Sequence, residues 1–144
     1  MRDIKYRGLS ELQSKWYEGD FITDVREFNR SCDKAYILPH WDKLNCPIQV
    51  LPNSVGQYTG LKDKNGREIF EGDIVSFVVF DYLDSDVEYK GVVKYRSGLY
   101  EIWKNADSEF FGSNGPFILN HAWLQDDEFE VIGNIYENPE LLNA

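Results

Sequence analysis

Residues 57–80 read QYTGLKDKNGREIFEGDIVSFVVF, and this stretch decides the fold. Asn65-Gly66 is its strongest local signal, because both central positions of a two-residue type I′ hairpin turn need positive φ and this pair tolerates it. Polar residues stand on either side of the pair. We therefore expect one strand over 57–62 to enter a hairpin and a second strand over 67–70 to leave it.

A second sharp turn follows at Glu71-Gly72-Asp73. Gly72 can adopt backbone conformations that are closed to other residues, and Asp73 can accept hydrogen bonds from neighbouring N–H groups. The apolar run over 74–80 has the length of a buried strand. A tight turn that opens an apolar strand is typical of small β-barrels. A Gly72→Val substitution should destabilise this corner by about 1–3 kcal/mol through backbone strain.

Nearly the same seven letters occur earlier in the chain. Residues 16–22 read WYEGDFI and residues 69–75 read IFEGDIV, and a Tyr-x-Gly-Leu group precedes each copy. Agreement of that length indicates an internal repeat, and two copies are too few for a solenoid. We therefore expect Gly19-Asp20, like the later Gly-Asp pair, to form a corner that begins a strand, so that the chain holds two related β-units.

The rest of the chain fits the same interpretation, with at most short helices. Val, Ile and aromatic residues favour strands. Residues 23–37 fit either a short helix or a strand, and the pattern does not decide between them. Residues 39–56 hold three prolines and read as a connector. Alternation and turn signals predict strands over 90–95, 99–103 and 128–136, loops over 81–88 and 108–116, and a terminal helical turn that Asn138 caps.

The predicted fold class is therefore all-β, as a small barrel or sandwich, of which an SH3-like barrel is one form. A chain of 144 residues has the size of one ordinary domain. We expect a single domain over 1–144. The repeat could divide it into two packed subdomains over 1–52 and 53–144, each with its own copy of the repeated unit.

Composition and charge restrict the class of function. The formal net charge is −10, which disfavours nucleic-acid binding because phosphate backbones attract basic surfaces. No apolar run approaches the about 18 residues of a membrane span, and the opening MRDIKYRGL lacks the apolar core of an export signal. We expect a cytoplasmic protein without a membrane segment, in which Cys32 and Cys46 are free thiols.

One candidate metal or nucleophile site contains Cys32, His40 and Cys46. Their spacing is C-x7-H-x5-C, whereas zinc sites usually show short paired spacings such as C-x2-C. Cys32 as a nucleophile with His40 as its base would need an orienting partner, and none is visible. We expect these three residues to be scattered core or surface residues.

Carboxylates form two further candidates. Asp81, Asp84, Asp86 and Glu88 are closely spaced, but the glycine and the long acidic spacing of a calcium loop are missing. Glu71 and Asp73 as a catalytic pair would need a base, a nucleophile or a metal. We expect no catalytic, cofactor or metal residues. The positions that we single out are structural turn residues: Gly19, Asp20, Asn65, Gly66, Gly72 and Asp73.

Aromatic residues make up 15 % of the chain, and they could stack nucleic-acid bases on a sheet surface. Such grooves normally add Lys and Arg, but this chain has 15 basic residues against 25 acidic ones. Core packing and the anchoring of protein interfaces explain the aromatics better.

Five stretches of the chain carry a resemblance to a known family: Ile4 to Gly8, Trp16 to Ile22, Val55 to Gly66, Glu68 to Val75 and Val131 to Leu141. They resemble the signature of the YopX family, whose members are encoded largely by phages and prophages of bacteria. The resemblance implies a β-rich fold and a phage accessory role. It implies no established activity, cofactor or catalytic residue that could be carried over.

Two functions from different classes follow from these observations. The first is a non-catalytic interaction module in the cytoplasm of the bacterial host, which binds a host or phage protein or a second copy of itself. The alternative is a nucleic-acid-associated protein, either a barrel-type binder or an acidic decoy. Their response to salt separates them, because phosphate binding weakens steeply with salt.

Overall fold

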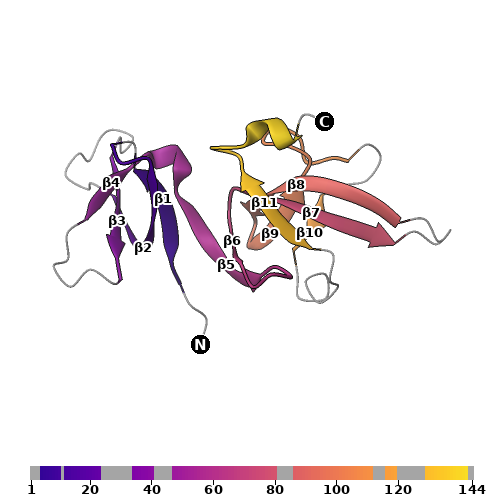
Figure 1. Cartoon of the computed structure of the whole chain (residues 1–144), viewed down its shortest axis with the longest axis horizontal. Coiled ribbons are helices and arrows are strands. Elements are labelled where there is room, and N and C mark those ends of the chain that lie inside the picture. Colours follow the sequence, from indigo (N-terminus) through magenta and orange to yellow (C-terminus); the bar gives the residue numbers. More distant parts are fainter. Residues whose placement is uncertain are drawn as a thin grey trace. The chain divides into compact units, whose positions relative to one another are not determined.

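The computed structural model describes residues 4–10, 12–23, 34–40, 47–80, 86–111, 116–119 and 129–142. Most of them lie in strands of two antiparallel sheets, and these described strands form no closed barrel (Figure 1). The only helical segments among them are two short 3-10 turns. The predicted all-β class is therefore confirmed, as open sheets. The chain divides into two compact units, Met1–Tyr58 and Thr59–Ala144.

The first unit consists of short antiparallel strands. Its elements are β1 (Tyr6–Ser10), β2 (Lys15–Thr23), β3 (Ala35–Pro39), β4 (Ile48–Val50), the 3-10 turn η1 (Pro52–Ser54) and the beginning of β5 (Gly56–Lys62). The strands lie side by side in the order β4-β3-β2-β1-β5. β2 is the longest of them and pairs with β1 on one side and with β3 on the other. β5 continues into the second unit.

The core of the first unit is small. Its buried apolar side chains are Tyr17, Ala35, Ile37 and Val50. The stretch that the sequence left undecided is a strand over its described part, because Ala35 and Ile37 alternate with half-buried neighbours in β3. The connector prediction is wrong for β4, since the short Ile48–Val50 strand places Val50 in this core.

The second unit contains the five-stranded sheet. Its elements are β6 (Glu68–Phe70), β7 (Asp73–Phe80), β8 (Asp86–Arg96), β9 (Leu99–Trp103), β10 (Phe117–Ile118), β11 (Glu130–Asn134) and the 3-10 turn η2 (Pro139–Leu142). The strand order is β10-β9-β8-β7-β11. The predicted strands are confirmed within a few residues at their ends, with β8 longer than expected. The predicted terminal turn forms as η2, where Leu141 N donates to the backbone oxygen of Asn138. The Asn138 side chain does not bond to η2 as a cap would, because its Oδ1 accepts from Asn134 N.

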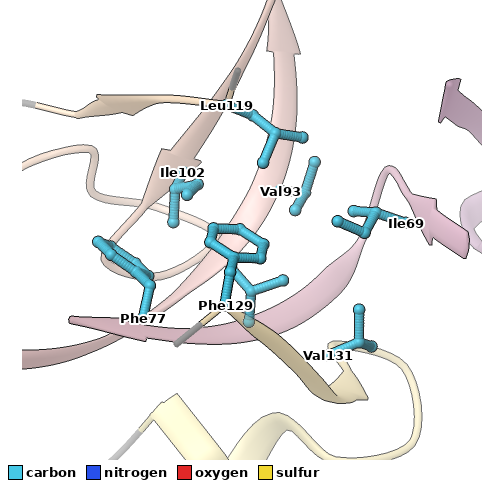
Figure 2. Packing of buried hydrophobic residues seen from close by; sticks show 8 residues of the cluster. Ile69, Phe77, Val93, Ile102, Leu119, Phe129 and Val131 are labelled. Atoms are coloured by element: carbon cyan, nitrogen blue, oxygen red, sulfur yellow. The ribbon is translucent and has the colours of Figure 1, made fainter. Parts of the chain in front are cut away.

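One side of this sheet carries the larger core (Figure 2). The rings of Phe77 and Phe129 stack with centroids 5.9 Å apart, and Phe117 meets Phe77 edge-on at 5.3 Å. Aromatic pairs in these arrangements stabilise beyond their buried area. The buried members of the core are Ile69, Val75, Phe77, Val93, Ile102, Leu119, Phe129 and Val131.

The two copies of the repeated sequence adopt different local structures. In the second copy Gly72 has φ of +93°, and the turn over Glu71 and Gly72 opens β7 at Asp73. In the first copy Gly19 and Asp20 lie inside β2, so no corner forms there. A Cβ on Gly19 would lie 2.0 Å from the carbonyl oxygen of Leu38. Glycine is therefore needed in the first copy for close strand contact, and in the second copy for a backbone bend.

The hairpin at Asn65-Gly66 forms where the sequence predicts it, but with a different turn. Gly66 N donates to Asp63 O at 3.0 Å, and Gly66 has φ of +79°, whereas Asn65 does not have positive φ. This combination is a type I turn followed by a glycine in the left-handed region, and not a type I′ turn. Two consecutive residues with positive φ occur instead at Ser97-Gly98, between β8 and β9.

Candidate functional site

The predicted Cys-His-Cys candidate falls largely outside the described residues. Cys32 and Cys46 lie there, and within the described ranges no group of His, Cys, Asp and Glu could hold a metal ion. His40 follows β3, where its Nε2 lies 2.8 Å from Oδ1 of Asp20 and both side chains are exposed. Asp20, expected at a turn, thus takes part in a surface pair. The described ranges also hold no helix long and apolar enough to cross a membrane.

Two of the candidate carboxylates, Asp73 and Glu88, accept hydrogen bonds from groups of the surrounding strands and turns. Asp73 is fully buried, and its Oδ2 accepts a hydrogen bond from Phe70 N at 2.8 Å, which closes the corner before β7. Glu88 Oε1 accepts a hydrogen bond from Ser76 Oγ at 3.0 Å on the neighbouring strand. Asp81 and Asp84 lie outside the described residues. Asp73 therefore acts as a turn residue.

Asp63 has a structural role that the sequence interpretation missed. Its side chain is buried, and Oδ1 accepts hydrogen bonds from Asn65 N and Arg67 N, each at 2.9 Å. Oδ2 accepts a third from Val131 N, also at 2.9 Å. One carboxylate therefore closes the hairpin turn and attaches it to β11. An Asp two residues before Asn-Gly is a signal for such a turn, but the contact with β11 needs the fold.

The side of β8 and β9 opposite the aromatic core brings cations and a tryptophan together around the buried Val92. Alternate residues of a strand point to the same side, so Lys90, Lys94 and Arg96 share one side of β8. Trp103 is registered opposite Val92 and lies on that side too. Lys94 Nζ and Arg96 Cζ lie 5.4 and 5.3 Å from the centroid of the indole ring. We call Lys90, Lys94, Arg96 and Trp103 the lysine–tryptophan face.

The cations of this face differ in their partners. Arg96 Nε lies 2.9 Å from Glu101 Oε1, and its Nη1 donates to Glu109. Desolvation acts to lower the pKa of Arg96, but the hydrogen bonds to Glu109 and Glu101 outweigh it, so this pKa lies above its ordinary value. Lys90 and Lys94, in contrast, form no ion pair with any residue in the described ranges. Their ammonium groups are available to a partner.

Exposed aliphatic side chains lie on the same side. Leu99 is registered opposite Arg96, and Ile118 opposite Glu101, so both share the side of the lysine–tryptophan face. Their exposed fractions are 48 % and 46 %. Exposed single aliphatics are common, but here they adjoin a half-buried tryptophan and two unpaired lysines. The surface therefore combines apolar, aromatic and cationic groups.

A pocket of about 370 Å³ adjoins the lysine–tryptophan face at Lys90. One wall is Phe111, whose ring lies 5.5 Å from that of Tyr89 and 5.2 Å from that of Phe117, so the aromatic core holds it. Gly91 allows this approach, because a Cβ there would lie 3.0 Å from Phe111 Cζ. We call it the end pocket; its lining residues are Glu88, Tyr89, Lys90, Lys104, Phe111, Leu141 and Leu142.

The sequence held part of this arrangement. The hairpin over 90–103 was predicted, and Trp103 belongs to the aromatic residues that were assigned as a group to core packing or protein interfaces. The spacing of Lys90, Lys94 and Arg96 at even intervals on one predicted strand was the signal that could have shown the face. Nothing in the sequence places η2 or Phe111 beside β8, so the end pocket could not have been found.

The comparisons with known proteins bear on the family and the fold. The model of the YopX protein family matches residues 5–143, which is nearly the whole chain. A crystal structure of protein EF1440 from Enterococcus faecalis is similar at a TM-score of 0.54 and 23 % identity, over 99 % of both chains. At that identity the likeness shows the fold alone. No curated protein matches the sequence. The family model spans both copies of the repeat, and the chain belongs to the YopX family.

Proposed function

We propose that the chain is a non-catalytic protein-interaction module whose contact surface is the lysine–tryptophan face. The observation that carries this proposal is the grouping of Trp103 with the exposed Leu99 and Ile118 on one side of a sheet. Tryptophan and arginine dominate the binding energy of protein interfaces, and apolar neighbours exclude water from them. Trp103 with its exposed aliphatic neighbours can anchor such an interface, and this role requires no catalytic residues.

Charge supports a protein partner more than a nucleic acid. Arg96 already has two carboxylate partners, Glu101 and Glu109, so it adds little free positive charge to the face. The chain as a whole carries −10. Phosphate binding needs a surplus of Lys and Arg that tracks a backbone. Lys90 and Lys94 are better suited to a few carboxylates at the rim of a protein interface.

The resemblance to the YopX family supplies the biological context of this proposal. The module would be a phage or prophage accessory protein in the cytoplasm of the bacterial host. Its partner would be a host protein, a phage protein or a second copy of the chain. The competing candidate remains a nucleic-acid-associated role, for which Lys90 and Lys94 are the favouring observation.

A pull-down with matched surface variants tests the proposal. The tagged chain is expressed in host cells with the prophage induced, and captured proteins are identified by mass spectrometry with and without nuclease. Leu99→Asp places a charge opposite Arg96, on the same side of the sheet as the lysine–tryptophan face. Val87→Asp is the control, because Val87 is 40 % exposed and lies on the opposite side of β8. The expected result is one partner that survives nuclease, is lost with Leu99→Asp and is kept with Val87→Asp.

Other outcomes have definite meanings. Equal capture by both variants would refute the assignment of the face. Capture that disappears with nuclease and falls steeply between low and high salt would move the function to nucleic acid. A single partner that is kept at high salt supports an interface anchored by apolar contacts, since screening affects those little.

A further inference from the structure

The end pocket is lined by both cationic and apolar side chains. Lys90 and Lys104 supply ammonium groups, and neither forms an ion pair with any residue that the structure describes. Leu141, Leu142 and Phe111 supply apolar walls. A volume of about 370 Å³ lies at the lower end of the range of small-ligand pockets. The lining therefore suits a small apolar group that carries a negative charge beside it.

The remaining charged side chain of the pocket does not cancel this preference. Glu88 also lines it, but Glu88 Oε1 already accepts a hydrogen bond from Ser76 Oγ. Two unpaired cations thus stand against one carboxylate that is already engaged. The free oxygen of Glu88 can still accept a hydrogen bond from an N–H group of the ligand.

An internal acidic residue does not match this pattern well. Asp and Glu carry their carboxylate at the tip of the side chain, away from any apolar group. In a C-terminal residue with an apolar side chain, the Cα bears the side chain, the terminal carboxylate and the nitrogen of an amide N–H group. The three groups then match the lysines, the apolar walls and Glu88. Capture of a terminal carboxylate is a recurring mode of peptide recognition.

We propose that the end pocket binds the C-terminal residue of a partner protein, with its apolar side chain against Leu141, Leu142 and Phe111 and its carboxylate between Lys90 and Lys104. This inference rests on the proposed function, because it assigns to the partner a free, apolar C-terminus. The adjacent lysine–tryptophan face, which includes Lys90, then contacts the residues that precede this terminus.

Peptide binding tests the inference directly. The probe is fluorescein-labelled Gly-Ser-Gly-Phe with a free carboxylate, titrated with the full chain and followed by fluorescence anisotropy. Two matched probes are the same peptide with a C-terminal amide and the peptide Gly-Ser-Gly-Gly. We expect both to bind about tenfold or more weakly, because each lacks one of the matched groups.

Variants assign the binding to the pocket. Lys90→Gln and Lys104→Gln should each weaken binding of the Phe-terminated acid about fivefold to tenfold. Lys62→Gln is the control, since Lys62 is an exposed lysine on β5 outside the pocket lining, and it should leave binding unchanged. Unfolding of a lysine variant is monitored by circular dichroism, and the change to glutamine keeps most of the side chain.

Several outcomes would overturn the inference. They are equal binding of the acid and the amide, no saturable binding of either, and full binding by both lysine variants. If free phenylalanine competes at the same concentration as the peptide, the ligand of the pocket is a free amino acid and not the C-terminus of a partner. The Leu99→Asp pull-down is independent of these results, so the pocket can fail while the interaction module stands.

Discussion

The corner at Gly72 gives the sharpest test of the structure, because a second glycine in the same unit serves as its control. Gly66 and Gly72 both have positive φ, at +79° and +93°. A Cβ on Gly66 would meet nothing within 4 Å, whereas a Cβ on Gly72 would lie 2.9 Å from Cε2 of Tyr136. The two substitutions to alanine thus share backbone strain and differ in steric contact.

The expected losses of stability follow from these distances. Left-handed backbone costs an L-residue about 1–2 kcal/mol, which is the whole expected effect of Gly66→Ala. Gly72→Ala adds a close contact with the tip of the Tyr136 side chain. Because this half-buried ring can shift, we expect the low end of the overpacking range, about 1 kcal/mol. The contact with Tyr136 therefore raises the expected loss of unfolding free energy above the loss from backbone strain alone. Gly72→Val should lose more stability than Gly72→Ala, because its side chain is larger.

Urea unfolding followed by circular dichroism measures these losses as differences in the free energy of unfolding. A third protein, Gly72→Ala with Tyr136→Ala, removes the steric contact. It should lose about 1 kcal/mol less than the sum of its two single variants. The reasoning on overpacking is refuted if Gly72→Ala loses no more than Gly66→Ala. The reasoning on strain is refuted if Gly66→Ala is as stable as the natural chain.

Three further predictions concern other positions. Asp63→Ala should destabilise the second unit by about 2–4 kcal/mol in urea unfolding. The substitution leaves three buried or part-buried N–H groups without an acceptor, Val131 N among them. A loss below about 1 kcal/mol would contradict this role of Asp63. Gly19→Ala should lower the melting temperature of the first unit, since its Cβ would lie 2.0 Å from Leu38 O; an unchanged transition in calorimetry would show that β2 and β3 can separate there. Asn138→Ala should cost about 1 kcal/mol in urea unfolding, because it removes the acceptor Oδ1 that Asn134 N donates to at the end of β11. An unchanged midpoint would count against this hydrogen bond.

The sequence predicted the strands of the second unit except β10, because the signals of the predicted strands are local. Alternation, an apolar run and glycine-containing turns mark β5 to β9, and each of these depends on residues close in the chain. The type of turn at Asn65-Gly66 was predicted wrongly, because the carboxylate of Asp63 holds a different turn there. Local propensity does not include that contact.

The first unit and the end pocket were harder to predict for one physical reason. The role of Gly19 depends on the approach of β3, and the strand β4 is only three residues long, so neither has a local pattern. The wall at Phe111 is likewise set by contacts with Tyr89 and Phe117. Packing between segments far apart in the chain decides these features, and a single sequence does not display it.

The contrast between Gly19 and Gly72 also has a consequence for the handedness of the residues that each position accepts. A mirror-image alanine prefers positive φ, so it would fit the backbone of Gly72 and restrict the unfolded chain at the same time. At Gly19 a side chain is excluded by the neighbouring strand, and the backbone does not have positive φ. Chemical synthesis with D-alanine would therefore distinguish two glycines that stand between the same neighbours, Glu and Asp, in the written sequence.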